Sequence, residues 1–279
     1  MEKKSQINIK LIIRYIGLTL GALIMAIPFV WMMLTSFKSF PETVKIPMTW
    51  FPSKINISNY IDVIERFNFG RYYLNTLIVT AFLTVGQIFM CSIAAYAFTR
   101  LRFPGRDIMF FIILSILMVP AQMTLIPRFL IVNQFGWINT YLGLIVPSLP
   151  SAYGVFFLGQ FLKGLPTEIE DSGKIDGCSI FRLFWSIVMP MCKNGVIAFG
   201  IVVVMWSWNE LLWPLTVTNT DKMSVLSIGL ATLNAMPGYA SKFNILMAAS
   251  VLITLPILAV FIIGQKKFIS GIVISGLKT

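Results

Sequence analysis

Acidic side chains, which can act as acids, bases and metal ligands, gather in one short stretch of this chain. Glu168, Glu170, Asp171 and Asp176 are four of its eleven acids and fall within nine positions. We expect them to be exposed, with no buried pocket, nucleophile or second-site partner beside them, which argues against acid–base chemistry. The chain has no histidine, so imidazole metal ligands, His-activated nucleophiles and His proton relays are excluded.

The other reactive groups also argue against catalysis. The three cysteines, Cys91, Cys178 and Cys192, form no CxxC pair, which argues against a structural disulfide or a zinc site. The sequence lacks the phosphate-binding pattern G-x-x-x-x-G-K-S/T, so the chain cannot hydrolyse a nucleotide by that route. We therefore predict a protein that is not an enzyme and has no catalytic, cofactor-binding or metal-binding residues of its own.

Charge is scarce in the rest of the chain. Of its 279 residues, 57% are hydrophobic and only 12% are charged, whereas soluble proteins carry about 25% charged residues. The net charge of +11 could suggest nucleic acid, but no basic run is interleaved with exposed aromatic residues, so we expect no nucleic-acid partner. This composition is typical of a protein embedded in a lipid bilayer.

Long uncharged runs recur at the length of a membrane-spanning helix, which needs about 20 apolar residues. They lie at 15–36, 72–99, 108–127, 129–162, 194–220 and 243–265, the fifth interrupted only by Glu210. Within the fourth run, the turn-rich residues 133–140 predict a loop before a helix that begins near Tyr141. The sequence therefore predicts an all-α, polytopic membrane protein with six transmembrane helices.

The distribution of Lys and Arg predicts the orientation, because these residues concentrate in cytoplasmic segments. Fourteen of the 22 fall in the termini and in the second and fourth loops, against eight on the other side. Both termini should therefore be cytoplasmic. The expected segments are a cytoplasmic N-terminus (1–14), a first span (15–36), an ordered external loop (37–71), a core (72–265) that contains a cytoplasmic loop (163–193), and a cytoplasmic tail (266–279).

The acidic stretch itself predicts two short helices. Thr167 and Glu170 fit a capping box at the start of the first helix, and Glu170 forms a favourable i, i+4 pair with Lys174. A turn at Asp176-Gly177 follows, because Gly tolerates positive φ. A second, amphipathic helix then runs from 179 to near 190.

One face of the first helix carries Ile169, Ser172, Gly173 and Asp176, and its small pair would let another surface approach closely. We interpret it as a candidate docking face for a partner. The alternative is a solvated hairpin between two spans, whose carboxylates only keep it hydrated. The residues alone favour neither interpretation.

The same stretch resembles the cytoplasmic loop of permease subunits from binding-protein-dependent ABC importers. That loop has the pattern Glu-Ala-Ala, three residues, Gly, nine residues, then Ile-x-Leu-Pro. Here Asp-Ser-Gly at 171–173 stands at the Glu-Ala-Ala positions, Gly177 at the glycine, and Ile187, Met189 and Pro190 at the closing positions. The acid and the small residues are kept in kind rather than in identity, and Met replaces Leu.

Further motifs are similar to those of carbohydrate-uptake permeases, in particular the smaller membrane subunit of maltose-type importers. They are TSFK (35–38), NTL (75–77), AAYAFTR (94–100), WNE (208–210) and ISGIVISGLK (269–278). Each motif is weak alone, but together they occur in order along nearly the whole chain.

The resemblance implies a type-1 ABC importer permease fold in a bacterial or archaeal cytoplasmic membrane. It implies that this chain and a second permease form the pathway for a sugar or oligosaccharide, and that an extracytoplasmic protein delivers the sugar. Two partner ATPase subunits would bind ATP and Mg, with no cofactor in this chain, and their closure would tilt the spans through the cytoplasmic loop. The residues that it assigns to ATPase coupling are Glu170, Asp171, Ser172, Gly173, Asp176, Gly177 and Pro190.

Glu210 keeps another interpretation open, because an acid within a spanning run is costly and suggests a function. It could couple protons in a secondary transporter. However, it lies roughly 24 Å along a helix that begins near Asn194, towards the predicted external side. We therefore favour a gate or structural role for Asn209 and Glu210. A non-transporting membrane scaffold is a third class, but it does not account for the docking face.

Three tryptophans lie in the same run, at positions 206, 208 and 213. They could stack on sugar rings in a cavity. Anchoring at the membrane interface is the commoner role of Trp, and we favour it here.

Overall fold

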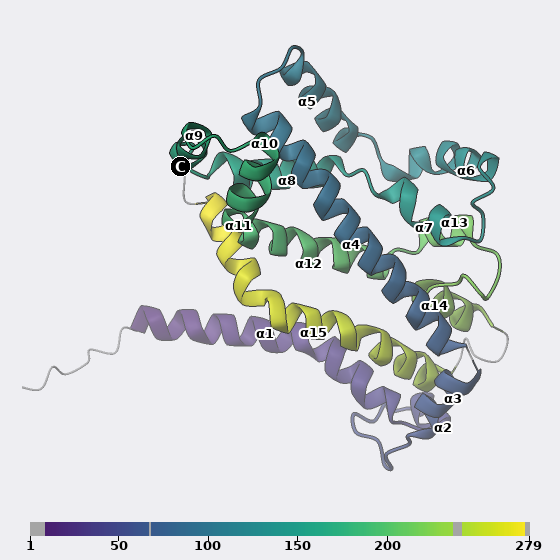
Figure 1. Ribbon diagram of the computed structural model, residues 1–279. Helices are drawn as coiled ribbons and strands as arrows, with labels where there is room; N and C mark the ends of the chain where they lie inside the picture. Colours follow the sequence, from purple (N-terminus) through teal and green to yellow (C-terminus); the bar gives the residue numbers. More distant parts are fainter. Residues whose placement is uncertain (1–8, 67, 237–241, 277–279) are drawn as a thin grey trace, which may run out of the picture. The chain divides into compact units, whose positions relative to one another are not determined.

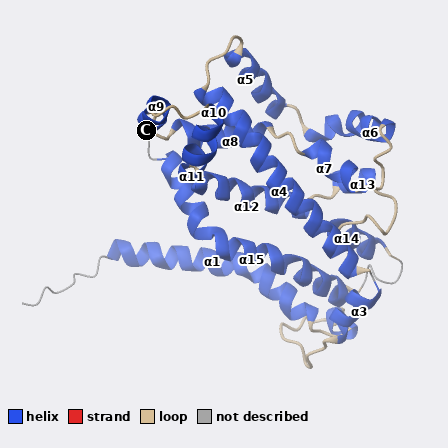
Figure 2. Cartoon of the chain, viewed as in Figure 1, coloured by secondary structure: helices blue, strands red, loops and turns tan. Residues whose placement is uncertain are grey.

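Residues 9–66, 68–236 and 242–276 are described by the computed structural model of the chain (Figure 1). Helices make up all of the regular secondary structure in these ranges, and no strand occurs in them (Figure 2). The all-α prediction is therefore confirmed.

Three long helices carry the first, second and last predicted spans. They are α1 (Ile9–Ser36), α4 (Phe69–Arg100) and α15 (Phe243–Gly276). Each holds a stretch that is long and apolar enough to cross a bilayer, at Ile13–Ser36, Phe69–Arg100 and Phe243–Gln265. Pro28 and Pro256 lie inside α1 and α15 without ending them.

The run at 108–127 does not form one continuous helix. It divides between α5 (Arg106–Ser115) with η1 (Ile116–Met118) and η2 (Ala121–Thr124) with α6 (Leu125–Gln134), and the two parts are bent by 100°. Pro120 explains the break, because a proline ring disfavours the helical conformation in the residue before it. Val119 is accordingly extended, with φ −87° and ψ 119°.

The next predicted span is bent less sharply. Helix α7 (Tyr141–Ile145) with η3 (Val146–Ser148) meets α8 (Ala152–Lys163) at 48°. The break contains Pro150, which lacks a backbone donor, and Ser151, whose hydroxyl accepts a hydrogen bond from the Gly154 N–H at 3.0 Å and so caps α8. The predicted start of this span at Tyr141 is confirmed, but the helix expected from there to Leu162 is interrupted before Ala152.

The remaining helices are shorter. They are α2 (Phe40–Thr43), α3 (Ser58–Arg66), α9 (Glu168–Ile175), α10 (Ile180–Leu183), the π-helical turn η4 (Phe184–Val188), α11 (Met189–Met191), α12 (Lys193–Asn209), α13 (Leu212–Val217) and α14 (Leu226–Ala235). By length and apolarity, the described residues hold three spanning helices, or up to six if each of three bent helix pairs counts as one span. This count is compatible with the six predicted spans.

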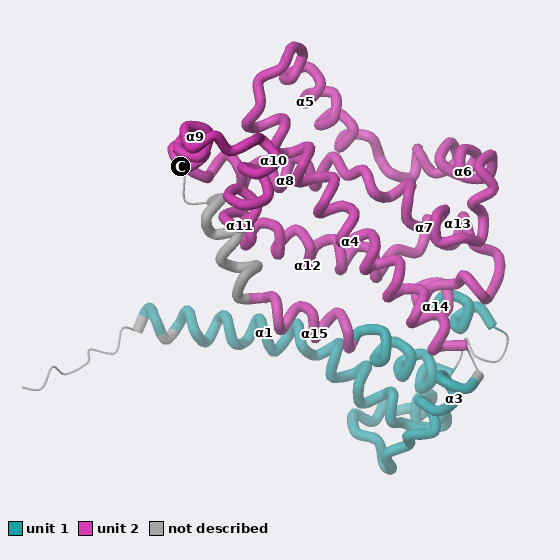
Figure 3. The backbone as a smooth tube through the Cα atoms, in the orientation of Figure 1, with its two compact units in different colours: residues 1–67, 230–254 teal, residues 68–229, 255–279 magenta. Residues whose placement is uncertain are grey.

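Contacts divide the chain into two units, residues 1–67 with 230–254 and residues 68–229 with 255–279 (Figure 3). In the first unit, a buried asparagine orders the segment that follows α1. Asn59 donates from Nδ2 to the carbonyls of Ser36 and Lys38 at 2.7 and 2.9 Å, and its Oδ1 accepts from Asn244 Nδ2 at 2.8 Å. These hydrogen bonds join α3 to the end of α1 and to the start of α15, whereas the external position of the predicted loop stays a prediction.

Two charged residues of this segment are also held by their neighbours. Lys38 is only 2% exposed, and its ammonium lies 4.3 Å from the centre of the Trp31 ring. The Glu42 carboxylate accepts hydrogen bonds from the N–H and hydroxyl groups of both Ser39 and Ser53. These bonds, led by the one from the Ser53 hydroxyl, lower the pKa of Glu42 to about 2.

In the second unit, α4 packs against both α8 and α12. Two buried clusters lie along it. One contains Cys91, Ala95, Leu158 and Phe199, and the other contains Val79, Leu83, Leu144 and Trp213. Gly154 allows the close approach of α8, since a Cβ there would lie 2.5 Å from Phe199 Cζ. The two candidate sites described next lie along α4 beside these clusters.

Candidate functional site

Helix α9, at the centre of the predicted coupling residues, turns one face into the protein. Glu170 and Gly173 are buried, and the other residues of the helix are exposed. Ile169 and Ile175 are 42% and 86% exposed. A helix that is otherwise polar therefore presents apolar side chains outwards.

The buried Glu170 meets an arginine at the end of α4. Glu170 Oε1 lies 2.9 Å from Arg100 Nε, with the two side chains 6% and 9% exposed. The Nε–H bond does not point at this oxygen, so the contact is ionic rather than a hydrogen bond. Tyr96, also on α4, donates its hydroxyl to Glu170 Oε2 at 3.3 Å.

Arg100 also reaches the end of α8. Its Nη2 donates to the carbonyls of Leu162 and Leu165 at 2.5 and 2.8 Å. These carbonyls lie at and just beyond the C-terminus of α8, where a helix carries partial negative charge. A single guanidinium therefore fixes α9 to both α4 and α8.

This arrangement corrects two predictions about Glu170. It does not pair with Lys174, whose Nζ instead contacts Asp171 Oδ1 at 2.8 Å in an exposed pair. It does not complete a capping box either, because the Thr167 side chain makes no capping hydrogen bond. Both local rules failed because the Glu170 carboxylate turns inwards to the charge of Arg100.

Gly173 is not on an outward docking face, contrary to the prediction. A Cβ at Gly173 would lie 2.6 Å from Leu183 Cδ2 and 3.1 Å from Ile187 Cδ1. The missing side chain makes room for the chain's own next helical segment, α10 with η4. Ile169, Ser172 and Asp176 are exposed, so the rest of the predicted face remains open.

The predicted turn and second helix are confirmed. Gly177 has φ +76°, and the N–H groups of Gly177 and Cys178 donate to the carbonyls of Lys174 and Gly173 at 3.0 and 2.9 Å, which closes α9 as a Schellman motif. Ser179 then caps the next helical segment through its hydroxyl, which accepts from an N–H in the first turn. That segment continues through Pro190 to Met191 and meets α12 at a 77° bend.

Glu210 lies in the break between α12, which ends at Asn209, and α13, which begins at Leu212. Its backbone is extended, with φ −65° and ψ 123°, and its Oε1 accepts a hydrogen bond from the Trp213 N–H at 3.2 Å. Asn209 is exposed and donates from Nδ2 to the Met205 carbonyl at 2.7 Å. The run predicted at 194–220 is therefore divided at Glu210, because the carboxylate satisfies a backbone donor of the second helix.

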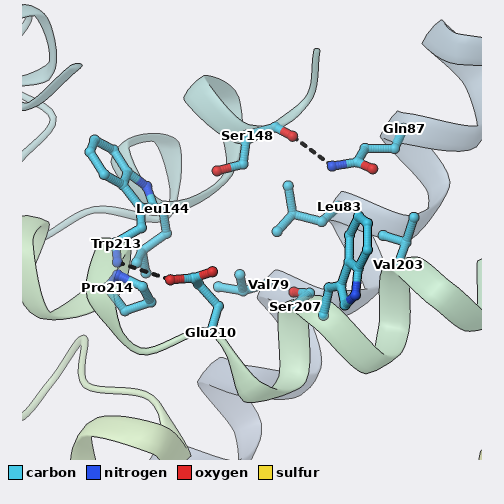
Figure 4. Close-up of a pocket in the computed structure, with 11 residues that line it drawn as sticks. Val79, Leu83, Gln87, Leu144, Ser148, Val203, Ser207, Glu210, Trp213 and Pro214 are labelled. Atoms are coloured by element: carbon cyan, nitrogen blue, oxygen red, sulfur yellow. Dashed lines mark hydrogen bonds between the residues drawn. The ribbon is translucent and has the colours of Figure 1, made fainter. Parts of the chain in front are cut away.

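A cavity of about 160 Å³ lies beside Glu210, bordered by α4, η3, α12 and the start of α13 (Figure 4). Its polar lining residues are Gln87, Ser148, Ser207 and Glu210. Gln87 donates from Nε2 to the Ser148 carbonyl at 2.7 Å, and Ser207 shares a 3.1 Å hydrogen bond with the Thr80 hydroxyl. Most of the remaining wall is aliphatic or aromatic.

Arg128, on α6, lies behind one wall of this cavity. Its guanidinium is centred 4.1 Å from the Trp213 ring and donates to Ser148 Oγ at 3.0 Å. Its positive charge attracts the Glu210 carboxylate. Arg128 is one of the eight basic residues outside the predicted cytoplasmic segments, and its place as a lone charge between the apolar runs 108–127 and 129–162 is a signal from which its role could have been predicted.

The three tryptophans of this region differ. Trp208 and Trp213 are 5% and 4% exposed, and Trp213 Nε1 donates to the Gly143 carbonyl at 3.1 Å. These two are core residues, so the predicted anchoring role at a membrane interface does not fit them. Trp206 is 59% exposed and lines the cavity.

The described residues contain no group of three or more His, Cys, Asp and Glu side chains that could hold a metal ion. Cys91 and Cys192 are buried free thiols, and Cys178 is a partly exposed one. The described residues therefore form a buried Arg100–Glu170 contact and a mostly apolar cavity with a few polar groups, but they assemble no metal-ligand cluster.

The sequence matches a protein family and several transport proteins over most of its length. Residues 87–273 match the model of a protein family described as the binding-protein-dependent transport system inner membrane component. The arabinooligosaccharides transport system permease protein AraQ of Halalkalibacterium halodurans is 32% identical over 266 residues, which are 94% of this chain and 95% of that protein. The sn-glycerol-3-phosphate transport system permease protein UgpE of Brucella abortus is 29% identical over 269 residues, 94% and 95% of the two chains.

Solved structures show the same fold. A chain of a bacterial ABC transporter involved in the import of the acidic polysaccharide alginate matches with a TM-score of 0.79 at 20% identity, covering 96% of this chain and 99% of that one. A chain of a bacterial alginate ABC transporter in complex with alginate pentasaccharide-bound periplasmic protein matches with a TM-score of 0.66 at 12% identity, covering 92% and 94%. The expected type-1 ABC importer permease fold is therefore confirmed.

The family match begins at Gln87 on the cavity wall, includes Arg100 and the whole α9–α11 segment, and continues past Glu210. It covers more than half of the chain, and both the helical fold and the apolar spans agree with it. This multi-pass membrane protein thus belongs to the family of binding-protein-dependent transport system inner membrane components.

Proposed function

We propose that this chain is a permease subunit of an ATP-driven ABC importer and forms, with a second permease, the pathway for a sugar or oligosaccharide. The family match supports the transport role, and the named relatives include an arabinooligosaccharide permease. Partner ATPase subunits would bind and hydrolyse ATP with Mg, and an extracytoplasmic binding protein would deliver the sugar. Alternating access would follow closure of the ATPases.

The observation that carries the coupling role is the way α9 is held. Its buried side is tied to α4 and α8 through Arg100 and Glu170, while Ile169 and Ile175 are exposed on its other side. An exposed apolar pair on a rigidly held helix suits a docking contact. A displacement of α9 by a bound partner would move α4 and α8 with it, because Arg100 and Glu170 connect the three helices. The ATPase contact therefore centres on Ile169, Ser172, Ile175 and Asp176, with Gly173 as the internal spacer.

In the membrane, this proposal places α9 and both termini in the cytoplasm. It places the first loop, with its ordered segment after α1, outside. The excess of Lys and Arg in the termini and in the second and fourth loops supports this orientation.

The function is tested in proteoliposomes that contain the full complex of permeases and ATPases, with ATP inside and sugar-loaded binding protein outside. Uptake of arabino-oligosaccharide should require ATP and should continue in the presence of a protonophore. Uptake driven by a pH step without nucleotide would overturn the proposal and favour proton coupling through Glu210. Glu210→Gln should leave the ATP requirement unchanged.

The coupling face is tested by Ile175→Asp, with Lys174→Ala as the matched control on the same exposed turn. Ile175→Asp should leave the permease in the membrane while reducing co-purification of the ATPase or uptake per ATP hydrolysed. Normal assembly and normal uptake in Ile175→Asp would show that this face is solvated and does not couple.

A further inference from the structure

Three kinds of side chain that recognise sugars meet at the Glu210 cavity. A carboxylate (Glu210), a primary amide (Gln87) and an exposed indole (Trp206) come from the start of the α12–α13 break, from α4 and from α12. Figure 4 shows Glu210 and Gln87 on either side of the open space, with Ser148 and Ser207 at its edge. A mostly apolar wall with a few convergent polar groups is the usual construction of a small-molecule site.

The polar groups retain unused hydrogen-bonding capacity. Glu210 Oε1 accepts a hydrogen bond from the Trp213 N–H, and Gln87 Nε2 donates one to the Ser148 carbonyl. Among the described residues, Glu210 Oε2 and Gln87 Oε1 have no hydrogen-bond partner, so both can accept from the hydroxyls of a ligand. Because their other atoms are already held, the two acceptors are fixed in place before a ligand arrives.

Trp206 supplies the apolar counterpart. Its ring is 59% exposed although Tyr153 packs on it, with the ring centres 5.0 Å apart. A large, rigid aromatic face loses little conformational freedom on binding and suits the C–H face of a sugar ring. A second, more open hollow is lined by Trp206, Glu210 and Asn209 among others. Trp206 and Glu210 therefore line both hollows, and the second could hold a further sugar ring.

The charge of the wall selects among carbohydrate classes. Glu210 lines the cavity, whereas Arg128, although it attracts Glu210, is not among the lining residues and donates to Ser148 and stacks on Trp213. A carboxylate facing a bound uronate or phosphate is a like-charge contact and penalises that ligand. The geometry therefore favours a neutral, hydroxyl-rich ring.

We propose, building on the importer function, that this cavity is a neutral-carbohydrate subsite of this chain, with Trp206 as the stacking surface and Glu210 and Gln87 as hydroxyl acceptors. The named relatives transport different classes, arabino-oligosaccharides in one case and sn-glycerol 3-phosphate in the other. The position of Glu210 places this subsite with the first class.

The subsite is tested by direct binding to the purified complex, without binding protein or ATP, so that the result does not depend on transport. Arabinotriose is titrated and followed by saturation-transfer NMR, with trigalacturonate and glycerol 3-phosphate as anionic probes. Wild-type complex should bind arabinotriose, and Trp206→Ala should weaken binding by about tenfold, since it removes the aromatic surface. Trp206→Phe should recover most of that loss, and Phe111→Ala, at an aromatic residue that is 70% exposed and lies outside the cavity lining, should have no effect.

Glu210→Gln tests the selection by charge. It should reduce the preference for arabinotriose over trigalacturonate, because the amide no longer repels an anion. Arabinotriose binding that is absent, that is unchanged in Trp206→Ala, or that is matched by trigalacturonate in the wild type would each overturn the subsite. A complex that binds arabinotriose as expected but shows no ATP-dependent uptake would retain the subsite and overturn only the importer function.

Discussion

An arginine acts on a glutamate in two places, by direct contact in the first and by the attraction of its positive charge in the second, and the two sites are built differently. At the end of α4, Arg100 and Glu170 touch at 2.9 Å, are 9% and 6% exposed, and the arginine also donates to two backbone carbonyls. At the cavity, Arg128 rests on Trp213 and donates to Ser148, and Glu210 accepts from the Trp213 N–H. We call the first site closed because both side chains are buried against each other, and the second open because Glu210 Oε2 has no hydrogen-bond partner among the described residues and Glu210 lines the cavity.

Glu170 is buried whereas Glu210 is exposed, so the two sites put a carboxylate to different uses. A closed ion pair gives little net stability but makes its geometry obligatory, because either partner alone would be a buried, uncompensated charge. At the second site Arg128 is engaged by Trp213 and Ser148, so the Glu210 carboxylate can still accept a hydrogen bond from a ligand that enters the cavity. Rigid force transmission needs the first arrangement, and ligand contact needs the second.

The largest effect is expected when the closed site loses one partner. Arg100→Met leaves Glu170 buried without a counter-charge, which typically costs about 3–5 kcal/mol. We expect a clear fall in thermal stability of the purified complex and faster proteolysis of the 163–193 loop. The double variant Arg100→Met with Glu170→Leu should recover much of the loss. Wild-type stability of Arg100→Met alone would show that the buried Glu170 does not depend on Arg100 for its counter-charge.

A somewhat smaller effect is expected when the close packing of α9 is disturbed. In Gly173→Ala the new Cβ meets Leu183 and Ile187, and overpacking typically costs about 1–3 kcal/mol. Thermal unfolding of the complex should show the loss. Ser172→Ala, one residue away on the exposed side, is the control and should be neutral for stability. Equal stability of the two variants would show that Gly173 does not pack against Leu183 and Ile187 and faces outwards instead.

Removing the arginine of the open site should change stability less. Arg128→Met gives up one hydrogen bond and a cation–π contact, worth about 0.5–2 kcal/mol together, and keeps an apolar chain over Trp213. We expect near-normal thermal stability and an altered arabinotriose affinity, measured on the same samples. A loss of stability as large as that of Arg100→Met would mean that the two sites are equally closed.

The smallest effect on stability is expected at the exposed ion pair on α9. Asp171 and Lys174 are about 60% exposed, and such pairs contribute roughly 0.2–1 kcal/mol at most. Lys174→Ala should therefore leave the melting temperature and ATPase co-purification unchanged within error. A marked defect would assign Lys174 a direct contact with the partner.

Sequence reasoning was most reliable where the physics is local. Long uncharged runs predicted helices because a bilayer demands them, and Gly177 predicted a turn because its backbone conformation is left-handed. The effect of each proline was less predictable. Pro28 and Pro256 stay inside continuous helices, whereas the break before Pro120 turns the chain by 100°. Neighbouring helices decide whether a freed carbonyl is satisfied, and the sequence does not specify those neighbours.

The site residues show the same limit. The local pairing rule assigned Glu170 to Lys174, four residues away, but its partner Arg100 is 70 positions earlier in the sequence. Gly173 and Ser172 both suggested close approach, and only packing reveals that the approaching surface at Gly173 belongs to the chain itself. Glu210 was recognised as exceptional, yet Gln87 and Trp206 became part of a site only when α4 and α12 were placed side by side.

The buried Lys38 and the hydrogen-bonded Glu42 make the segment after α1 sensitive to pH in one direction. Burial lowers the pKa of Lys38 from its usual 10.5, so unfolding takes up a proton and stability rises as pH approaches 10.5. The pKa of Glu42 falls from 4.5 to about 2, so its contribution is complete above pH 4.5 and is lost between 4.5 and 2. Fluorescence of the packed Trp31 and Trp50 rings should report a segment that loosens in acid and tightens in mild alkali, and the reverse trend would contradict this linkage. With the orientation proposed above, which places this segment outside the cell, it would tolerate alkaline surroundings better than acidic ones.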